Sequence, residues 1–236
     1  MADFKLSKPT RHIIENFAKI YNSIIFRSGQ LVTVVGKEQD VVAYAEIEDQ
    51  FPERFAINDI SKFLSILSLY DDPTLSIKDG KVLVIKGAGN RKFNFTLSGE
   101  KHIPTTEKNI DQFLEHFKDL TASFKLEASD LLAIKKNMSV AGLPYVTFAS
   151  NKSAIVVKAS DLTDTSDVFE MTLKTQSDAN FNMIFSEHKI NAMLEHDYDV
   201  SVFPNMVRFN TSWLGDKVKA RLEYFNAPDR GSKVNG

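Results

Sequence analysis

The sequence predicts an α+β protein with two similar domains, each with two helices packed on antiparallel sheets. A helix followed by a β-hairpin is predicted over residues 55–87, and the same plan recurs over residues 187–210. The chain has 236 residues, which is enough for two small domains with ample cores. We therefore expect four units, each a helix followed by strands, with two units in each domain.

The segment 55–87 has the clearest pattern in the chain. Asn58 or Asp59 can cap a helix there, because a side-chain oxygen can accept hydrogen bonds from the free N–H groups of the first turn. Asp79-Gly80 is a turn that requires positive φ, between two strands of a hairpin. The apolar residues on one face of the helix are Ile60, Phe63, Leu64 and Leu67, and the alternating residues of the hairpin are Leu75, Ile77 and 82–85.

The rest of the first half contains another helix and several strands. The helix is predicted over 5–23, where Ser7 can act as the cap and Pro9 lies in the first turn, where its missing N–H costs nothing. Its buried face would carry Ile13, Ile14, Phe17, Ala18 and Tyr21. The further strands are expected over 24–27, 31–35, 41–47 and 92–97.

The second half repeats this plan after a polar segment. Residues 99–124 are rich in charges and turn formers and are the predicted connector, with a short amphipathic piece over 110–117. Trp213 is expected to be buried in a sheet near a turn. The expected helices are 129–138 and 187–195, the latter capped by Ser186, and the expected strands are 145–149, 154–158, 169–174, 180–185, 200–203, 207–210 and 217–225. The predicted domains are 1–98 and 125–228, joined by the connector 99–124 and followed by a polar tail, 229–236.

The repeat also bears on assembly. The segment 75–85 aligns with 200–210, and in both cases a short helix ending in acidic residues comes first. A single helix on a sheet leaves a sheet edge open, and open edges favour pairing with another chain. Two similar domains joined head to tail therefore indicate closure into a ring, since heterologous contacts either close or form a filament.

Composition limits the classes of function. The formal net charge is −2, whereas proteins that grip nucleic acid are usually basic, so a DNA role would require segregated charge or a loose association. The chain has no cysteine, which excludes disulfides, thiolate metal sites and a cysteine nucleophile, and suits the cytoplasm. No membrane-spanning run or signal-peptide segment is present.

Several segments resemble the DNA-polymerase sliding clamps of T4-like bacteriophages. The segment INDISKFLSILSLYDD, at 57–72, carries the strongest likeness, and three shorter ones follow the same order as in those clamps. The likeness covers most of the chain and is more specific in the first domain. The shorter segments are Lys5-Leu6-Ser7-Lys8, Asn16-Phe17-Ala18 and Ser28-Gly29-Gln30.

The resemblance implies a fold, a function and partners. Subunits of this kind form a homotrimeric ring with helices around a central hole and sheets on the outside. The ring would encircle double-stranded DNA and tether the replicative polymerase, giving processivity without covalent chemistry or a cofactor. An ATP-dependent clamp loader would open it, and late-transcription factors are partners in some relatives. Such a protein would act in the cytoplasm of the host cell.

A set of basic residues on or beside the predicted helices would then face DNA. For each one the alternative is an ordinary solvated helix face, and the helix predicted over 187–195 weakens the pattern because it is acidic. A ring needs only a few phosphate contacts, since topology keeps it on DNA. The predicted DNA-facing residues are Lys5, Lys8, Arg11, Lys19, Lys62, Lys125, Lys135 and Lys136.

The end of the chain, 222–228, resembles the last strand and tail of proliferating-cell nuclear antigen, the eukaryotic clamp. That resemblance implies a pocket for an apolar, often aromatic, peptide anchor. The alternative is that Tyr224 and Phe225 are core residues and the tail is loose; one of this pair is expected in the core, because neighbouring strand residues point to opposite faces. The predicted pocket residues are Ile110, Phe113, Leu114, Pro204, Tyr224, Ala227 and Pro228.

The sequence offers little for an enzyme. None of the five histidines has a recognised metal-ligand spacing, Asp161, Asp164 and Asp167 do not follow the calcium-loop pattern, and no GxSxG motif is present. We expect no metal site. A metal-free hydrolase or isomerase would need two carboxylates that the fold brings together. The other alternative is a β-rich oligomeric protein-interaction module that does not bind DNA, which the net charge suits.

Overall fold

The computed structural model describes residues 3–164, 166–215 and 218–235, apart from the side chains of 212–220 and 235. The chain divides into two compact units. Unit 1 comprises Met1–Glu107 and Ser212–Leu222, and unit 2 comprises Lys108–Thr211 and Glu223–Gly236. The expectation for Trp213 concerns a side chain outside those described. No helix in the described part of the chain is long and apolar enough to cross a membrane.

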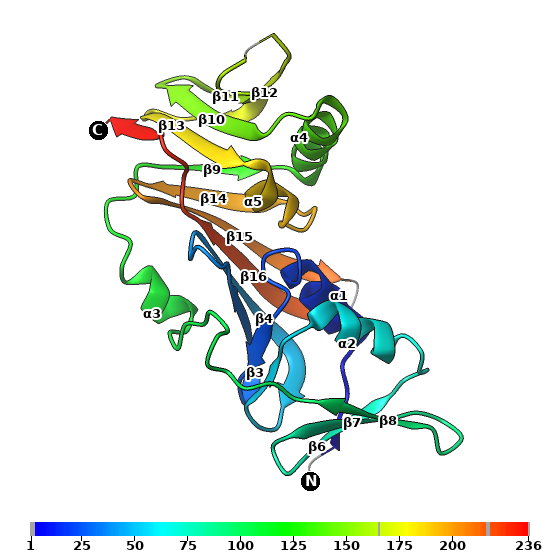
Figure 1. Cartoon of the computed structure of the whole chain (residues 1–236). Helices are drawn as coiled ribbons and strands as arrows, with labels where there is room; N and C mark the ends of the chain where they lie inside the picture. The colour runs from blue at the N-terminus through cyan, green and yellow to red at the C-terminus, as the bar shows by residue number, and fades with distance from the viewer. Residues whose placement is uncertain (1–2, 165, 216–217, 236) are drawn as a thin grey trace. The chain divides into compact units, whose positions relative to one another are not determined.

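Unit 1 contains two helices and a series of antiparallel strands (Figure 1). One sheet has the order β1-β6-β7-β8, β2 pairs with β5, and β3 pairs with β4. The elements are β1 (Asp3–Phe4), α1 (Lys8–Phe17), β2 (Ile24–Phe26), β3 (Gly29–Val35), β4 (Val41–Phe51), β5 (Phe55–Ile57), α2 (Ile60–Leu67), β6 (Thr74–Lys78), β7 (Val82–Lys86) and β8 (Lys92–Thr96).

Unit 2 has the same kind of architecture. Its largest sheet has the order β12-β11-β10-β13-β17, and β9 pairs with β14, which pairs with β15. The elements are α3 (Ile110–Leu114), β9 (Ala122–Leu126), α4 (Ala128–Ala141), β10 (Tyr145–Asn151), β11 (Ala154–Ser160), β12 (Val168–Gln176), β13 (Asn180–Ser186), α5 (Glu187–Asn191), β14 (Tyr198–Phe203) and β17 (Lys233–Asn235). Two further strands, β15 (Met206–Gly215) and β16 (Val218–Asn226), belong partly to unit 1 and partly to unit 2.

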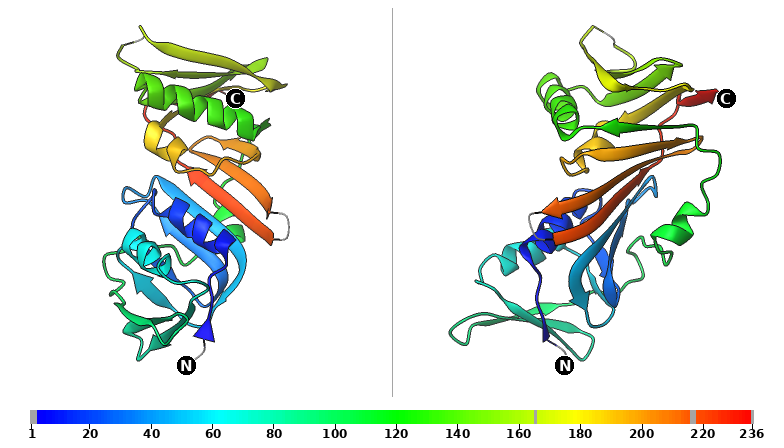
Figure 2. Two further views of the ribbon diagram at one scale, coloured as in Figure 1. Left: turned by 90° about the vertical axis from the view of Figure 1, so that its right-hand side faces the viewer. Right: turned by 180° about the vertical axis from the view of Figure 1, so that it is seen from behind.

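The predicted capping residues begin the helices of unit 1. Asp59 accepts a hydrogen bond from the N–H of Lys62 at 2.9 Å, and Ser7 accepts one from the N–H of Thr10. These bonds satisfy donors that a helix start leaves free. The two helices contact each other and lie side by side (Figures 1 and 2).

The repeated helix-and-hairpin plan is confirmed. The β6–β7 hairpin turns at Asp79-Gly80, both with positive φ, and the β14–β15 hairpin turns at Pro204-Asn205. The helices α4 and α5 contact each other in unit 2, as α1 and α2 do in unit 1. Gly142 ends α4 in a left-handed conformation, a position where a side chain would be strained.

Aromatic side chains build both cores. In unit 1 the rings of Phe26 and Phe55 stack with centroids 4.7 Å apart, and Phe63 on α2 packs edge-on against Phe95 of β8. In unit 2 the ring of Phe148 lies against Phe185. The abundance of phenylalanine in the sequence is thus used in sheet packing.

Some predicted bounds were wrong. The first helix spans Lys8–Phe17 rather than 5–23, because the N–H groups of Lys19 and Ile20 bond to carbonyls three residues back, in turns that end the helix. The fourth helix is only Glu187–Asn191, and the Ser186 side chain makes no capping bond. Two segments in which no strand was predicted contain one: β9 at the end of the connector pairs with β14, and β17 in the tail pairs with β13.

Candidate nucleic-acid interface and partner site

The basic residues predicted to face DNA differ in their environments within unit 1. Lys8, Lys19 and Lys62 are exposed. Lys5 forms an ion pair with Asp72, and the Arg11 guanidinium donates through Nε to the carbonyl of Leu6 at 2.9 Å. A groove of about 440 Å³ runs between α1 and α2, with Arg11 and Ser65 among the residues that line it. Exposed cations therefore lie on and beside this helix pair.

In unit 2 the predicted cations separate into two kinds. Lys125 on β9 and Lys136 on α4 are exposed. Lys135 is mostly buried: its ammonium donates to the carbonyl of Met193 at 2.5 Å and lies 3.5 Å from the Glu195 carboxylate. The Lys135 ammonium thus links α4 to the segment that follows α5.

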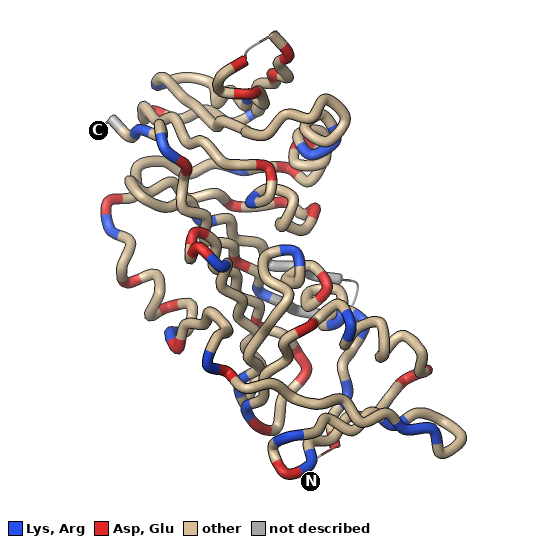
Figure 3. Tube along the Cα trace, viewed as in Figure 1, with Lys and Arg blue, Asp and Glu red and all other residues tan. Residues whose placement is uncertain are grey.

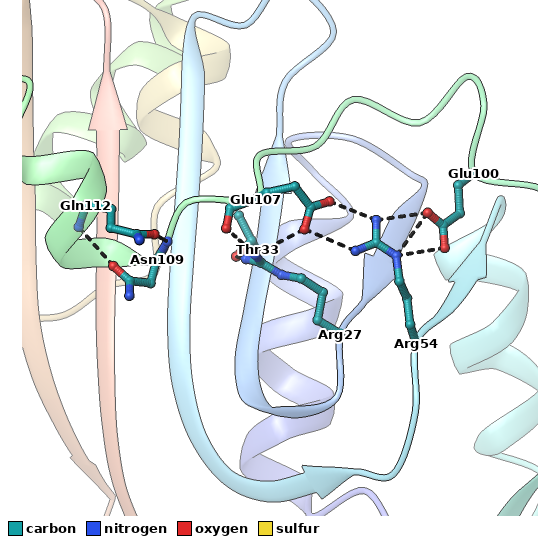
Figure 4. Close-up of polar contacts among 7 residues, drawn as sticks. All are labelled: Arg27, Thr33, Arg54, Glu100, Glu107, Asn109 and Gln112. Atoms are coloured by element: carbon teal, nitrogen blue, oxygen red, sulfur yellow. Dashed lines mark hydrogen bonds and ion pairs between the residues drawn. The ribbon is translucent and has the colours of Figure 1, made fainter.

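The first part of the connector is held by arginines of unit 1 (Figure 4). The Arg54 guanidinium binds the carboxylates of both Glu100 and Glu107, with N–O distances of 2.9 to 3.1 Å. Arg27 donates to the carbonyl of Glu107 at 2.9 Å and to the hydroxyl of Thr33. These hydrogen bonds raise the pKa of Arg54 and lower the pKa of Glu107, so both groups stay charged.

The connector then forms the short helix α3. Asn109 and Gln112 form a reciprocal capping box, in which each side chain accepts a hydrogen bond from the backbone N–H of the other. Helix formation turns Ile110 into the unit, where it is buried, and leaves Phe113 and Leu114 half-buried. The pattern that predicted an amphipathic piece over 110–117 therefore gives a shorter helix with the expected apolar face.

An aromatic cluster forms where α3 meets the end of β16, within unit 2. The ring of Phe113 lies 4.7 Å from Phe225, and the ring of Phe117 lies 5.9 Å from Phe225 and 5.7 Å from Phe203. Phe113 and Phe117 are half-buried, so part of this aromatic cluster is accessible. Phe117, Phe203 and Phe225 were not predicted as pocket residues; the aromatic spacing along 113–117 was the signal for Phe117.

Tyr224 is not part of this aromatic cluster. Its ring is fully buried and packs against Tyr198, and its hydroxyl oxygen accepts a hydrogen bond from the N–H of Leu194 at 3.2 Å. Burial raises the pKa of both tyrosines, so both remain neutral. Since neighbours in a strand point to opposite faces, Phe225 faces α3 and Tyr224 faces the opposite side. Both residues of the pair are thus buried, although only one was expected to be.

The remaining predicted pocket residues, Pro204, Ala227 and Pro228, lie in a turn of unit 2 and directly after the strand β16. Pro204, in the β14–β15 turn, is exposed next to Phe203 of the aromatic cluster. Ala227 and Pro228 are half-buried where the chain leaves β16. The tail beyond them is anchored, because Asp229 binds the buried Lys189 of α5 at 2.8 Å.

The described residues offer no metal site: nowhere among them do three metal-ligating His, Asp or Glu side chains come together. Asp161 and Asp164 accept hydrogen bonds from Thr163 and Ser166, which lowers the pKa of each carboxyl, as in ordinary polar turns.

Solved structures share this fold over the whole chain. Proliferating cellular nuclear antigen from Entamoeba histolytica matches 97% of the chain with a TM-score of 0.70 at 15% identity. The A. fulgidus PCNA, solved with the C-terminal region of FEN-1 bound, matches 99% with a TM-score of 0.67, and a PCNA2–PCNA3 complex from Sulfolobus tokodaii has a TM-score of 0.66. The predicted fold class, a DNA-clamp fold of helices on antiparallel sheets, is confirmed.

Sequence relatives then define the family. The chain is 30% identical over 229 residues to the sliding clamp of Vibrio phage KVP40, covering 95% of this chain and 99% of that protein. It is 25% identical over 226 residues to the sliding clamp of Escherichia phage RB69, and 40% identical over 68 residues to that of Enterobacteria phage T4. No protein-family profile matches it. The chain belongs to the sliding clamps of T4-like phages, and its function is that of a processivity clamp in DNA replication.

Proposed function

We propose that three copies of this chain form a ring around double-stranded DNA and tether the replicative polymerase of the phage. The observation that carries the proposal is the similarity to a phage sliding clamp over 95% of the chain. The repeated architecture supports it, since each unit has a pair of neighbouring helices that can face DNA and sheets that can form a wall. The protein would act in the cytoplasm of the host cell and catalyse no reaction.

The exposed cations of the helix pairs would contact the phosphates. Because the net charge is −2, we propose weak, transient contacts that leave the ring free to slide. Lys5, Arg11 and Lys135 contribute less to this set, since all three are engaged with acceptors of the chain itself. The exposed DNA-facing set is then Lys8, Lys19, Lys62, Lys125 and Lys136.

The joint between copies would pair the edge strand β8 with the edge strand β12 of the next copy. Each strand ends its sheet and has mainly exposed residues, which is the condition for pairing with another chain. Along their inner faces the apolar rows continue to the edge, with Phe93 on β8 and Phe169 and Met171 on β12 partly exposed. Joining the two edges would bury these side chains.

Charge supports the same joint. Residues 78–96 carry five basic side chains and one acidic one, whereas 161–178 carry five acidic and one basic. Figure 3 shows the two groups as a blue stretch at the β7–β8 hairpin and a red stretch on the loop before β12. Opposite charges on the two surfaces favour a head-to-tail contact and disfavour contacts between like surfaces.

Partner proteins would bind the half-exposed aromatic cluster of α3 and β16. An apolar or aromatic anchor of a peptide, such as the C-terminus of the polymerase, could insert between Phe113, Phe117 and Pro204. The proposed pocket keeps Ile110, Leu114, Ala227 and Pro228 as supporting residues, with Phe225 in the place expected for Tyr224. An ATP-dependent clamp loader and late-transcription factors are further partners that could use this pocket.

Assembly and DNA retention test the proposal directly. Light scattering should give a mass near three times 26.6 kDa, and the protein should remain on nicked circular DNA and slide off the same DNA after it is cut. A stable dimer, or equal retention on circular and linear DNA, would contradict a trimeric ring. Retention on neither DNA would favour the alternative, an interaction module that does not bind DNA.

The absence of cysteine allows a clean test of the joint. The double variant Asn94→Cys/Thr172→Cys places thiols at the centres of β8 and β12, at exposed positions. Oxidation should link three copies into a covalent ring. The control Asn94→Cys/Ser123→Cys uses the exposed edge strand β9 instead and should not form linked rings.

A further inference from the structure

Lys189 is a buried cation in unit 2 that the proposed contacts with DNA do not use. It lies on α5, and only 2% of its side-chain surface is exposed. A buried ammonium is costly unless it is paired and hydrogen-bonded, and an apolar side chain would fill the same place at lower cost. The contacts of Lys189 therefore indicate what its charge is for.

Those contacts lie on both sides of Pro228. The Lys189 ammonium donates to the carbonyl of Ala227 at 2.8 Å and to the carboxylate of Asp229 at 2.8 Å. Pro228 has no N–H and cannot anchor its own backbone by donating a hydrogen bond. Lys189 thus fixes the residue before the proline and the residue after it.

Asp229 extends this anchor to the neighbouring strand. Its other carboxylate oxygen accepts a hydrogen bond from the N–H of Ser186 at 2.6 Å, and its own N–H donates to the carbonyl of Ile184 at 2.8 Å. Ser232 completes the turn, since its hydroxyl donates to the Asp229 carbonyl and accepts from the N–H of Ile184. The tail is therefore fixed at the point where it leaves β16, well before the three-residue strand β17.

We infer that Lys189 is a positioning residue for partner binding: its buried ammonium holds Ala227 and Pro228 in place as the rim of the peptide pocket. This inference rests on the proposed pocket of unit 2. Ordering a backbone residue costs conformational entropy, so a rim that is already fixed spares the incoming peptide that cost. Without Lys189 the rim would have to become ordered when the peptide binds.

The variant Lys189→Met tests the inference, because it keeps the length of the buried side chain and removes the charge. The probe is a labelled peptide with the C-terminal sequence of the replicative polymerase of the same phage. We expect roughly tenfold or more weaker peptide binding, which corresponds to ordering a residue or two. Amide hydrogen exchange should accelerate over 227–235, while the mass of the assembly stays the same.

Lys135→Met is the matched control. Lys135 is also largely buried and also donates to a backbone carbonyl of unit 2, but its acceptor is Met193 and not the tail. We expect this variant to lose stability without weakening peptide binding. Asp229→Asn is the second variant, since it weakens the same anchor from its more exposed end.

The possible outcomes separate the inference from the proposed function. If Lys189→Met and Asp229→Asn bind the peptide as tightly as the wild type while the tail amides exchange faster, the positioning role is overturned and the pocket stands. Equal losses of affinity in Lys135→Met and Lys189→Met would assign both effects to general destabilisation and would also overturn it. Failure of the wild type to bind the peptide would overturn the pocket and the inference together.

Discussion

Arg208 and Glu223 form a two-pronged ion pair in which the carboxylate is fully buried. The Arg208 Nε and Nη2 atoms donate to the two carboxylate oxygens at 2.8 and 2.9 Å, and none of the Glu223 side chain is exposed. The planar guanidinium matches the carboxylate in a way that lysine cannot. The pair joins neighbouring parts of unit 2 at a place where an unpaired charge could not be tolerated.

Removal of the arginine should therefore be costly. We expect Arg208→Met to lower the free energy of unfolding by about 3–5 kcal/mol, the usual cost of leaving a buried charge unpaired. Urea unfolding measures this. The double variant Arg208→Met/Glu223→Leu should recover much of the loss, because it leaves no buried charge; a double variant as unstable as the single one would show that packing, not charge, accounts for the loss.

The Arg54 ion pairs should have a different effect. Arg54 is 37% exposed, and solvent screening limits the contribution of such pairs to at most about 1 kcal/mol. Arg54→Gln should therefore change global stability little but accelerate amide exchange over 100–107, because it releases Glu100 and Glu107 together. Lys174→Gln, which breaks the single exposed pair with Glu127, is the control and should leave that segment protected.

Tyr224 and Phe113 should respond differently to substitution. Tyr224→Phe leaves the N–H of Leu194 without its acceptor, so we expect a stability loss of about 1–3 kcal/mol and unchanged peptide affinity. Phe113→Ala should weaken binding of the polymerase peptide with a smaller effect on stability, since its ring is half-buried. Weaker peptide binding by Tyr224→Phe would return that residue to the pocket.

The exposed cations predict a salt-dependent association with DNA. Replacing Lys8, Lys62 and Lys136 by glutamine should shorten retention on circular DNA at low salt and flatten its dependence on salt, because fewer counterions are released. The ring mass should not change. Glutamine at Lys37 and Lys101, which are equally exposed and outside the proposed DNA face, should leave both quantities near wild type.

The tail anchor predicts a response to acid. Burial by itself would raise the pKa of Asp229, but hydrogen bonds from Lys189 and Ser186 outweigh it and leave the pKa lowered. A lowered pKa in the folded protein means that the stabilisation is present above the ordinary carboxyl pKa and is lost as the pH falls through the folded value. Tail amides should therefore exchange faster in acid, after correction for the intrinsic rate, and Asp229→Asn should remove this dependence.

The sequence by itself determined the repeated plan of the fold. Helix periodicity over 60–67, the caps Ser7 and Asp59 and the turn at Asp79-Gly80 are local signals, which depend on residues close together in the sequence. The resemblance of 57–72 to phage clamps likewise depends only on the order of residues. These features were sufficient for the fold class and the family.

Only the tertiary structure decided which side chains are exposed for contacts with DNA or with partner proteins. Lys135 and Lys136 are neighbours on one helix, yet Lys135 is mostly buried and donates to the Met193 carbonyl, whereas Lys136 is exposed. Tyr224 and Phe225 are neighbours on one strand, and which of them meets α3 depends on the face that packing turns inward. The strand β17 in the tail forms by pairing with β13, and the charge of the buried Lys189 is paired with Asp229. In both cases the partner is distant in sequence. Pairing and burial are long-range properties, and a residue type alone does not fix them.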